Sequence, residues 1–447
     1  MHYVVVGAGP TGVIAAETLR KTDPSSQITL IGDEPEPPYS RMAIPYYLVE
    51  KVGEPGTYLR KDDSHYPAQR IELRHDRVER IDMAARQLTL HSGDPVQYDE
   101  LLIATGARPI RPPIPGVDAP GVHTCWTLDD ARHILELARP GAKVLLLGAG
   151  FIGCIILEAL ALRGVDLTVV EMGDRMVPRM MDPVAGNLLK RWCQEKGVNV
   201  HTSTSVTAIE HQAALPSAQG SGGGVWAFFS RLTGKAREPE AGAAPSHPLR
   251  VSLSNGSQLD ADLVISAAGV KSNLELTAGT GVRTDAGILV DEYFRTNVPH
   301  IYAAGDVAQG RDFSTGEYQV HAIQPTASEH GRIAALNMCG HATPYLGSLN
   351  MNVLDTLGLI SSSFGLWMGV DGGDHAELID PENFRYLSLQ FKGDVLVGAQ
   401  SLGLTQHVGV LRGLIQGQTP LGEWKEKLVR DPTRIMEAYL QRQLAYQ

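Results

Sequence analysis

Short, uninterrupted apolar runs along the chain are each followed by a glycine-rich turn and then by a segment suited to a helix. The runs over residues 3–6 and 144–147 contain only Tyr, Val and Leu, as in strands that a parallel sheet buries on both faces. A second, largely apolar run, residues 27–31 or 165–170, follows each helical segment. This order of strand, turn, helix and strand predicts two βαβ units.

The pattern changes from about residue 345 onward. Residues 385–391 and 395–399 flank a Lys-Gly-Asp turn, which predicts a β-hairpin. Residues 406–416 predict a helix with its apolar residues on one face. We therefore expect a separate α+β domain at this end of the chain.

Two glycine-rich turns, residues 7–12 (GAGPTG) and 148–153 (GAGFIG), join the predicted strands to the predicted helices. In such a turn the first glycine permits a tight bend, the second lets backbone amides approach a pyrophosphate, and the third allows the helix to pack closely on the strand. The helix adds free N–H groups and a positive dipole end. Asp33 with Glu34, and Glu171, end the next strands, where an acid can bind a ribose hydroxyl. The pair of turns predicts a protein that passes electrons between two dinucleotides.

Glu171 also bears on the choice between NADH and NADPH at the second turn. A carboxylate accepts hydrogen bonds from a 2′-hydroxyl and repels a 2′-phosphate, so NADH is favoured over NADPH. Arg175 lies close enough in the sequence to keep the use of both open.

A strand that ends in glycine recurs near the end of each predicted unit. Residues 101–106 lead into the proline-rich crossover 110–116, a stiff linker. Residues 263–269 repeat the strand-then-glycine pattern, and a helix near 128–138 opens the second unit. The two halves are therefore internally similar.

Residues 212–248 interrupt the second unit with a stretch rich in Gly, Ala, Ser and Pro, which is too polar to form a core and which we expect to be mobile. Its centre holds three aromatic residues within 226–229. These form either a docking or membrane-touching patch, or a short segment that folds back onto its own domain, which we favour.

Composition narrows the classes of function. The chain has 50 acidic and 39 basic residues and a net charge of -11, which argues against a nucleic-acid partner. The first strand starts near residue 2, with no room for a leader, and no apolar run approaches the about 20 residues that span a bilayer, so we expect a cytoplasmic protein. The cysteines lack C-x-x-C spacing, which indicates neither a redox dithiol nor a metal site, and we expect inert, buried thiols. They are Cys125, Cys154, Cys193 and Cys339.

Four motifs, in the order 7–12, 104–106 (ATG), 148–153 and 304–306 (AGD), carry a resemblance that covers the whole chain. The chain resembles the pyridine nucleotide-disulfide oxidoreductase family, in the branch that contains NADH oxidase, CoA-disulfide reductase, rubredoxin and ferredoxin reductases and the flavin part of NADH-dependent nitrite reductase. The resemblance implies FAD at the first turn, NAD(P)H at the second, and a hydrogen bond between Asp306 and the ribityl chain of the flavin.

The implied fold is α/β, with two Rossmann-like dinucleotide-binding domains, for FAD and NADH, and a C-terminal α+β interface domain. The FAD-binding domain, residues 1–115, resumes at 271–340 after the NAD(P)H-binding domain, 116–270, and residues 341–447 form the interface domain through which a homodimer is expected. A helix start near Thr326 would stabilise negative charge on the reduced flavin, or serve as an ordinary cap. The cofactor contacts expected from the motifs are Gly7, Gly9, Pro10, Gly12, Asp33, Glu34, Arg41, Ala104, Thr105, Gly106, Gly148, Gly150, Phe151, Ile152, Gly153, Glu171, Gly269, Gly305, Asp306, Pro325 and Thr326.

The chain departs from its relatives at the positions of their catalytic groups. Met42 stands where CoA-disulfide reductases and water-forming NADH oxidases carry a catalytic cysteine, so thiol chemistry is not expected. Relatives that use a rubredoxin- or ferredoxin-type partner pair a lysine with a glutamate near the flavin, and these positions are Tyr46 and Ile155 here. An ion pair replaced as a unit by uncharged groups explains both changes, and Glu158, one helical turn on, is a partial substitute.

Tyr46, Glu158 and His321 are the candidate catalytic residues. Tyr46 or Tyr47 would shield the flavin or gate nicotinamide entry, the alternative being plain packing against the ring. His321 would donate a proton to a bound substrate, although a lone histidine, like His330 nearby, is more often structural.

These observations predict an FAD-dependent NAD(P)H oxidoreductase that passes electrons from NADH through FAD to a protein or small-molecule acceptor without a redox-active cysteine. The acceptor is left open among a small iron–sulfur or rubredoxin-like protein, a quinone or dye, and oxygen. One alternative is a redox-responsive flavoprotein binding module with slow turnover, and another is reverse operation, in which a small substrate is oxidised and NAD is reduced.

Overall fold

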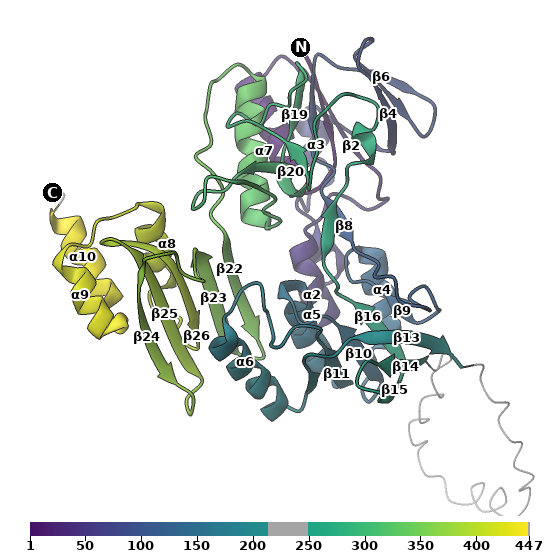
Figure 1. The fold of residues 1–447 in the computed structure, drawn as a ribbon. Coiled ribbons are helices and arrows are strands. Elements are labelled where there is room, and N and C mark those ends of the chain that lie inside the picture. The colour runs from purple at the N-terminus through teal and green to yellow at the C-terminus, as the bar shows by residue number, and fades with distance from the viewer. Residues whose placement is uncertain (213–248, 446–447) are drawn as a thin grey trace, which may run out of the picture.

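The computed structural model describes residues 1–212 and 249–445 (Figure 1). The predicted insertion, with its aromatic segment 226–229, lies outside the described residues from position 213 to 248. No helix in the described ranges is both long enough and apolar enough to cross a membrane.

A five-stranded parallel sheet forms the first unit, in the strand order β19-β7-β1-β2-β3. Its central strands are the continuous apolar runs, and side chains such as Val5 and Leu102 are fully buried, as expected for a sheet covered on both faces. The strands are β1 His2–Val6, β2 Gln27–Gly32, β3 Ile71–His75, β7 Glu100–Ile103 and β19 Ile301–Ala303.

Two long helices of the first unit, α1 (Pro10–Thr22) and α7 (Gln324–Met338), pack against each other although they lie far apart in the sequence. Shorter elements complete the unit: α2 Ile44–Leu48, α3 His65–Ala68, the antiparallel sheet of β4 Val78–Asp82, β5 Gln87–Leu90 and β6 Pro95–Gln97, and the small sheet of β18 Ile288–Leu289, β20 Ala308–Arg311 and β21 Tyr318–Gln319.

The second unit repeats the parallel sheet, in the order β12-β11-β10-β16-β9. Its strands are β9 Val122–His123, β10 Lys143–Leu147, β11 Asp166–Val170, β12 Asn199–His201 and β16 Leu263–Ser266. Its helices are α4 Leu128–Leu137, α5 Phe151–Leu162 and α6 Pro183–Glu195, and an antiparallel sheet of β13 Val206–His211, β14 Leu249–Leu253 and β15 Gln258–Ala261 lies beside them. The prediction of α/β units built on the two glycine turns is confirmed.

A narrow ribbon connects the two units (Figure 1). It consists of β8 (Ala107–Pro109) and β17 (Val270–Ser272), which pair antiparallel, so the chain leaves the first unit and returns to it along the same path. Besides this ribbon, α2 of the first unit packs against α4 and α5 of the second.

The C-terminal unit is a five-stranded antiparallel sheet in the order β22-β23-β26-β25-β24, with helices on one side (Figure 1). The predicted hairpin is present as β25 (Arg385–Lys392) and β26 (Val395–Leu402), and Gly393 takes the positive φ, 63°, that its turn requires. The other elements are β22 Met351–Thr356, β23 Leu359–Gly365, β24 Asp374–Asp380, α8 Val408–Gln416, α9 Glu423–Arg430 and α10 Ile435–Ala445. The expected α+β character is confirmed.

Candidate active site

The first glycine turn has the geometry that a nucleotide pyrophosphate requires. A Cβ added at Gly7 would lie 2.1 Å from the carbonyl oxygen of Ala104, and one at Gly12 would lie 1.8 Å from the carbonyl oxygen of Gly7. A Cβ at Gly9 would meet no atom within 4 Å. Gly7 and Gly12 therefore allow the strand, turn and helix to pack closely, whereas Gly9 leaves open space at the start of α1.

The second glycine turn repeats this arrangement. A Cβ at Gly148 would lie 2.7 Å from the carbonyl oxygen of Ala267, and one at Gly153 would lie 2.1 Å from that of Gly148. Gly150, like its counterpart in the first turn, faces open space. The sequence thus builds two equivalent cradles, each closed by two glycines and open at the one between them.

The helices at the cradles start without side-chain caps. α1 follows Gly9, α5 follows Gly150 and α7 follows Ile323, and no side chain caps any of these starts in the described chain. By contrast, Thr127 caps α4 and Asp182 caps α6 in the second unit. The uncapped starts keep N–H groups and a positive dipole end available for phosphate or for a negatively charged ring.

Asp306 lies beside the first cradle and fits a polyol. Burial raises the pKa of its carboxyl to about 6, and the positive charge of Arg41 acts in the opposite direction. Within the described part of the chain no hydrogen bond reaches this carboxylate, so its acceptor capacity is unused. Gly305 places it: a Cβ at Gly305 would lie 2.3 Å from Thr11 Oγ1, so the Gly-Asp turn sits directly on α1. The residues present therefore fit the ribityl chain of FAD.

The start of α7 is held against the same cradle. Thr11 Oγ1 donates to the carbonyl oxygen of Ala327 at 3.0 Å, and a Cβ at Gly331 would lie 2.3 Å from the carbonyl oxygen of Thr11. Ser40 Oγ donates to Gln324 Oε1 at 2.6 Å. Segments about 300 residues apart thus meet at one place, as the motif order implied. Sequence reasoning missed Ser40 and Gln324 as site residues, because only the fold brings them together.

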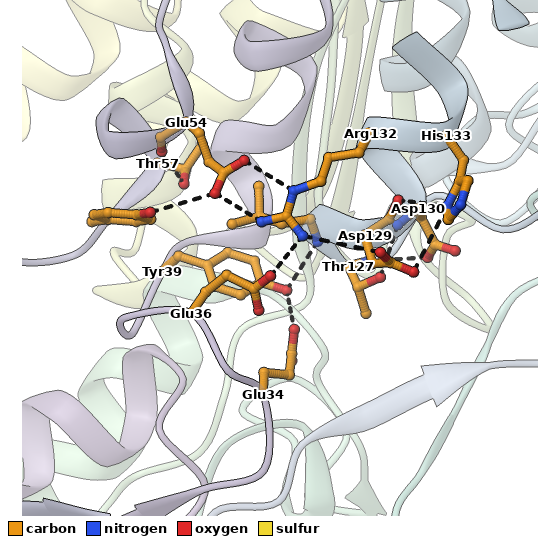
Figure 2. A network of polar contacts seen from close by, with 12 residues as sticks. Glu34, Glu36, Tyr39, Glu54, Thr57, Thr127, Asp129, Asp130, Arg132 and His133 are labelled. Atoms are coloured by element: carbon orange, nitrogen blue, oxygen red, sulfur yellow. Dashed lines mark hydrogen bonds and ion pairs between the residues drawn. The ribbon is translucent and has the colours of Figure 1, made fainter. Parts of the chain in front are cut away.

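Glu34 and Arg41, both expected at the first nucleotide, contact each other. Arg41 Nη2 donates to Glu34 Oε1 at 2.6 Å. The Tyr39 hydroxyl donates to the other carboxylate oxygen of Glu34 (Figure 2). Arg41 Nη1 also donates to the carbonyl oxygen of Trp126 at 2.6 Å. Asp33 beside them is exposed. Contacts of these side chains with a nucleotide stay predictions.

Glu171 ends β11 next to the second cradle. Its Oε2 accepts a hydrogen bond from the backbone N–H of Ala149 at 2.6 Å, and its Oε1 accepts one from Gly173 at 2.7 Å. The carboxylate therefore lies at the second turn, and its contact with a ribose stays a prediction. Arg175 turns away from it, since its Nε donates to the carbonyl oxygen of Met181 at 2.9 Å.

The three candidate catalytic residues lie in different surroundings. Tyr46 on α2 is 55% exposed. Glu158 Oε2 accepts a hydrogen bond from the backbone N–H of Leu357 at 3.1 Å, and burial raises the pKa of its carboxyl. His321 Nε2 forms a buried pair with Asp312 Oδ2 at 2.8 Å. Among the residues described, no hydrogen bond or ion pair joins any two of the three, and their catalytic roles stay predictions.

Thiols are poorly placed for redox chemistry. Burial raises the pKa of all four thiol groups, those of Cys125, Cys154, Cys193 and Cys339. All four are therefore protonated at neutral pH, and protonated thiols are weak nucleophiles. Met42, in the single turn Arg41–Ala43 that precedes α2, is 44% exposed.

Comparisons with known proteins identify the family of this chain. The family model described as pyridine nucleotide-disulphide oxidoreductase matches residues 1–331. The chain is 29% identical over 437 residues to NADH-dependent phenylglyoxylate dehydrogenase subunit epsilon of Aromatoleum evansii, which covers 97% of this chain and 96% of that protein. It is 31% identical over 347 residues to rhodocoxin reductase of Rhodococcus erythropolis, covering 77% and 74% of the two chains.

Two solved structures have the same fold. A ferredoxin reductase from Rhodopseudomonas palustris superposes with a TM-score of 0.77 at 27% identity, covering 92% of this chain and 93% of that one. An NAD-dependent persulfide reductase from A. fulgidus gives 0.81 at 28% identity, covering 95% and 78%. The chain therefore belongs to the pyridine nucleotide-disulphide oxidoreductase family and is an FAD-dependent NAD(P)H oxidoreductase.

Proposed function

We propose that this flavoenzyme takes a hydride from NADH and passes the electrons, through FAD, to a protein electron carrier without a redox-active cysteine. Met42 carries the proposal, because the resemblance aligns it with the catalytic cysteine of the thiol-dependent branch, and a thioether cannot become a thiolate. The raised pKa values of the thiols support the same conclusion.

A protein acceptor is supported by the relatives. Rhodocoxin reductase and the ferredoxin reductase from R. palustris are named for redox proteins, and a relative that matches over nearly the whole length is a subunit of a dehydrogenase. We infer that the acceptor carries a one-electron centre, such as an iron–sulfur cluster. Bound FAD supplies a hydride acceptor that can release electrons one at a time.

Each of the two cradles is assigned one dinucleotide. We assign the open start of α1 at Gly9, the carboxylate of Asp306 and the start of α7 at Thr326 to FAD. The open start of α5 at Gly150 and the carboxylate of Glu171 are assigned to NADH, with NADPH disfavoured by the negative charge of Glu171. The dipole of α7 stabilises negative charge on the reduced ring.

Met42 and Tyr46 are assigned a shielding role. Their side chains are 44% and 55% exposed in the described chain and neighbour each other through the turn that leads into α2. Large apolar groups at this place exclude water from a reacting ring, which favours hydride transfer over side reactions.

Anaerobic rapid mixing tests the proposal in two steps. Mixing the FAD-loaded protein with NADH is expected to bleach the flavin absorbance, and a second mixing with an oxidised [2Fe–2S] ferredoxin is expected to restore it. Alkylation with iodoacetamide should change neither rate. Reoxidation by CoA disulfide but not by the ferredoxin, or loss of turnover after alkylation, would contradict a cysteine-free path to a protein acceptor.

We further propose that residues 341–447 form a homodimer interface, as the resemblance implies. Sedimentation of the holoenzyme would give a mass near 97 kDa, twice the 48.3 kDa of one chain. A monomeric mass at micromolar concentration would exclude the dimer without affecting the redox proposal.

A further inference from the structure

The short helix α2 belongs to the first unit but is embedded in the second. Ile44 and Leu48 are 2% and 0% exposed and belong to the same apolar cluster as Ile134 of α4 and Leu157 of α5. The position of α2 therefore depends on how the NADH unit lies against the FAD unit, and a shift of α2 would in turn change how the two units lie against each other.

Arg132 of α4 joins the two units, because all three nitrogens of its guanidinium group bond to residues of the first unit (Figure 2). Its Nε and Nη2 donate to the two carboxylate oxygens of Glu54, at 3.0 and 2.7 Å, and its Nη1 donates to Glu36 at 2.7 Å. Glu36 and Glu54 lie on either side of α2 in the sequence of the first unit. A bidentate pair of this kind fixes orientation as well as distance.

The Arg132 network is partly shielded from water. The side chains of Glu36 and Glu54 are 10% and 27% exposed, and that of Arg132 is 36% exposed. The hydrogen bonds from Arg132 lower the pKa of Glu54, so the pair stays ionised at neutral pH. Charges in such a site attract each other more strongly than a fully exposed pair would.

A second guanidinium holds the other end of α2. Arg163, which follows α5, donates from Nη1 to the carbonyl oxygen of Leu48 at 2.7 Å and from Nε to that of Ala138 at 2.8 Å. One side chain, 14% exposed, thus joins the end of α2 to the end of α4. Leu48 is the last residue of α2, and Ala138 directly follows the last residue of α4.

The elements joined by these contacts are the ones that carry the cradles. α5 begins at Gly150, the open glycine of the second cradle, and α2 continues directly from the turn that holds Met42. That turn follows Ser40, which is hydrogen-bonded to the start of α7. A rigid path therefore runs from the NADH cradle through α2 to the FAD cradle.

We infer that Arg132 is a positioning residue for hydride transfer: by clamping α4 of the NADH unit to Glu36 and Glu54 on either side of α2, it sets the distance at which the nicotinamide meets the flavin. It acts through α2 and contacts neither cofactor. The inference concerns the NADH half-reaction and is independent of which acceptor is used.

Replacement of Arg132 by glutamine tests the inference in the FAD-loaded protein. Anaerobic mixing with NADH is expected to show an unchanged dissociation constant, because the second cradle is intact. The rate constant of flavin reduction is expected to be about tenfold lower, since a displacement of about 1 Å can cost about 100-fold and the loss of one clamp should cause a smaller one. The long-wavelength charge-transfer absorbance that NADH induces should weaken, because it requires the two rings to overlap.

Arg139→Gln is the matched control. Arg139 follows the same helix and is exposed, and in the described part of the chain its side chain donates a hydrogen bond only to the carbonyl oxygen of Glu136. This substitution removes the same charge seven residues further along the chain, without touching Glu36 or Glu54. It is expected to leave the rate constant and the charge-transfer absorbance unchanged.

Glu54→Gln removes the contact between Arg132 and Glu54 from the side of the first unit. Because glutamine keeps the shape of glutamate, this variant serves as the test if Arg132→Gln folds poorly. The double variant should be no slower than the slower single one, because both remove one interaction, and Arg132→Lys should restore part of the rate. A wild-type rate and absorbance in both Arg132→Gln and Glu54→Gln, at full FAD content, would overturn the inference. Equal losses in Arg139→Gln would overturn it as well. If wild-type protein is not reduced by NADH, the family reaction fails instead.

Discussion

Replacing single glycines of the second turn by alanine separates the two jobs that the turn performs. Gly150 faces open space, and a Cβ at Gly153 would lie 2.1 Å from the carbonyl oxygen of Gly148, where ordinary contact begins at 3.4 Å. Gly150→Ala should therefore spare the fold and obstruct NADH, whereas Gly153→Ala should strain the fold itself.

The surroundings of each glycine decide the expected changes in stability and in NADH affinity. Overpacking of a tight site costs about 1–3 kcal/mol, and alanine gains up to about 1 kcal/mol over glycine within a helix, so Gly153→Ala should lose about 1–2 kcal/mol of stability. Gly150 is the N-cap of α5 with an extended backbone that alanine can adopt, so Gly150→Ala should lose about 0.5–1 kcal/mol, the difference between glycine and alanine at an N-cap. Its methyl group would occupy the approach of the pyrophosphate, weakening NADH binding about 10- to 100-fold, or about 1.4–2.8 kcal/mol.

The assay is a comparison of the two variants at equal FAD content. Thermal unfolding reports the stability, and quenching of flavin fluorescence by NADH under anaerobic conditions reports the affinity. The reasoning is refuted if Gly150→Ala binds NADH as tightly as the wild type, or if Gly153→Ala is as stable as Gly150→Ala.

Further predictions concern nucleotide choice and pH. Glu171→Ala combined with Met172→Arg should shift the ratio of kcat/KM values toward NADPH by at least tenfold, because it replaces a repelling charge by an attracting one, and an unchanged ratio would exclude the role of Glu171. Burial raises the pKa of Asp306 to about 6. The ionised carboxylate therefore lowers the free energy of unfolding of the FAD-free protein above pH 6, and this destabilisation is lost as the pH falls toward 4. Asp306→Asn should therefore stabilise the FAD-free protein at pH 7.5 but not at pH 4.5 and should weaken FAD binding, and a pH-independent difference in melting temperature would contradict this. Burial lowers the pKa of His330 to about 3, so the contribution of the neutral ring to the free energy of unfolding is present above pH 6.5 and falls between pH 6.5 and 3. His330→Gln should make the free energy of unfolding in urea decline less steeply over this range. An unaltered pH profile would count against this prediction.

Much of the architecture could be predicted because it is encoded locally. Continuous apolar runs, glycine turns and a terminal acid such as Glu171 stand close together in the sequence, and each fixes one βαβ unit. The hairpin at residues 392–394 was predictable for the same reason. Weakly alternating strands such as β4, where only Ile81 is buried, carry too little pattern to be predicted.

The polar contacts of the site could not be predicted, because they depend on long-range packing. Glu158 bonds to Leu357, 199 residues away, and nothing in either neighbourhood indicates the other. Arg132 is one of 39 basic residues in the chain, and only the fold selects Glu54 as its partner. The histidine expected to donate a proton, His321, is paired with an aspartate that the sequence analysis did not single out.

A crystal structure of the protein with FAD and NAD⁺ bound would test the central claim most directly. The account predicts both cradles filled, with the nicotinamide C4 about 3–3.5 Å from the flavin N5 and Arg132 still hydrogen-bonded to Glu54. A nucleotide in only one cradle, or a side chain separating the two rings, would contradict it.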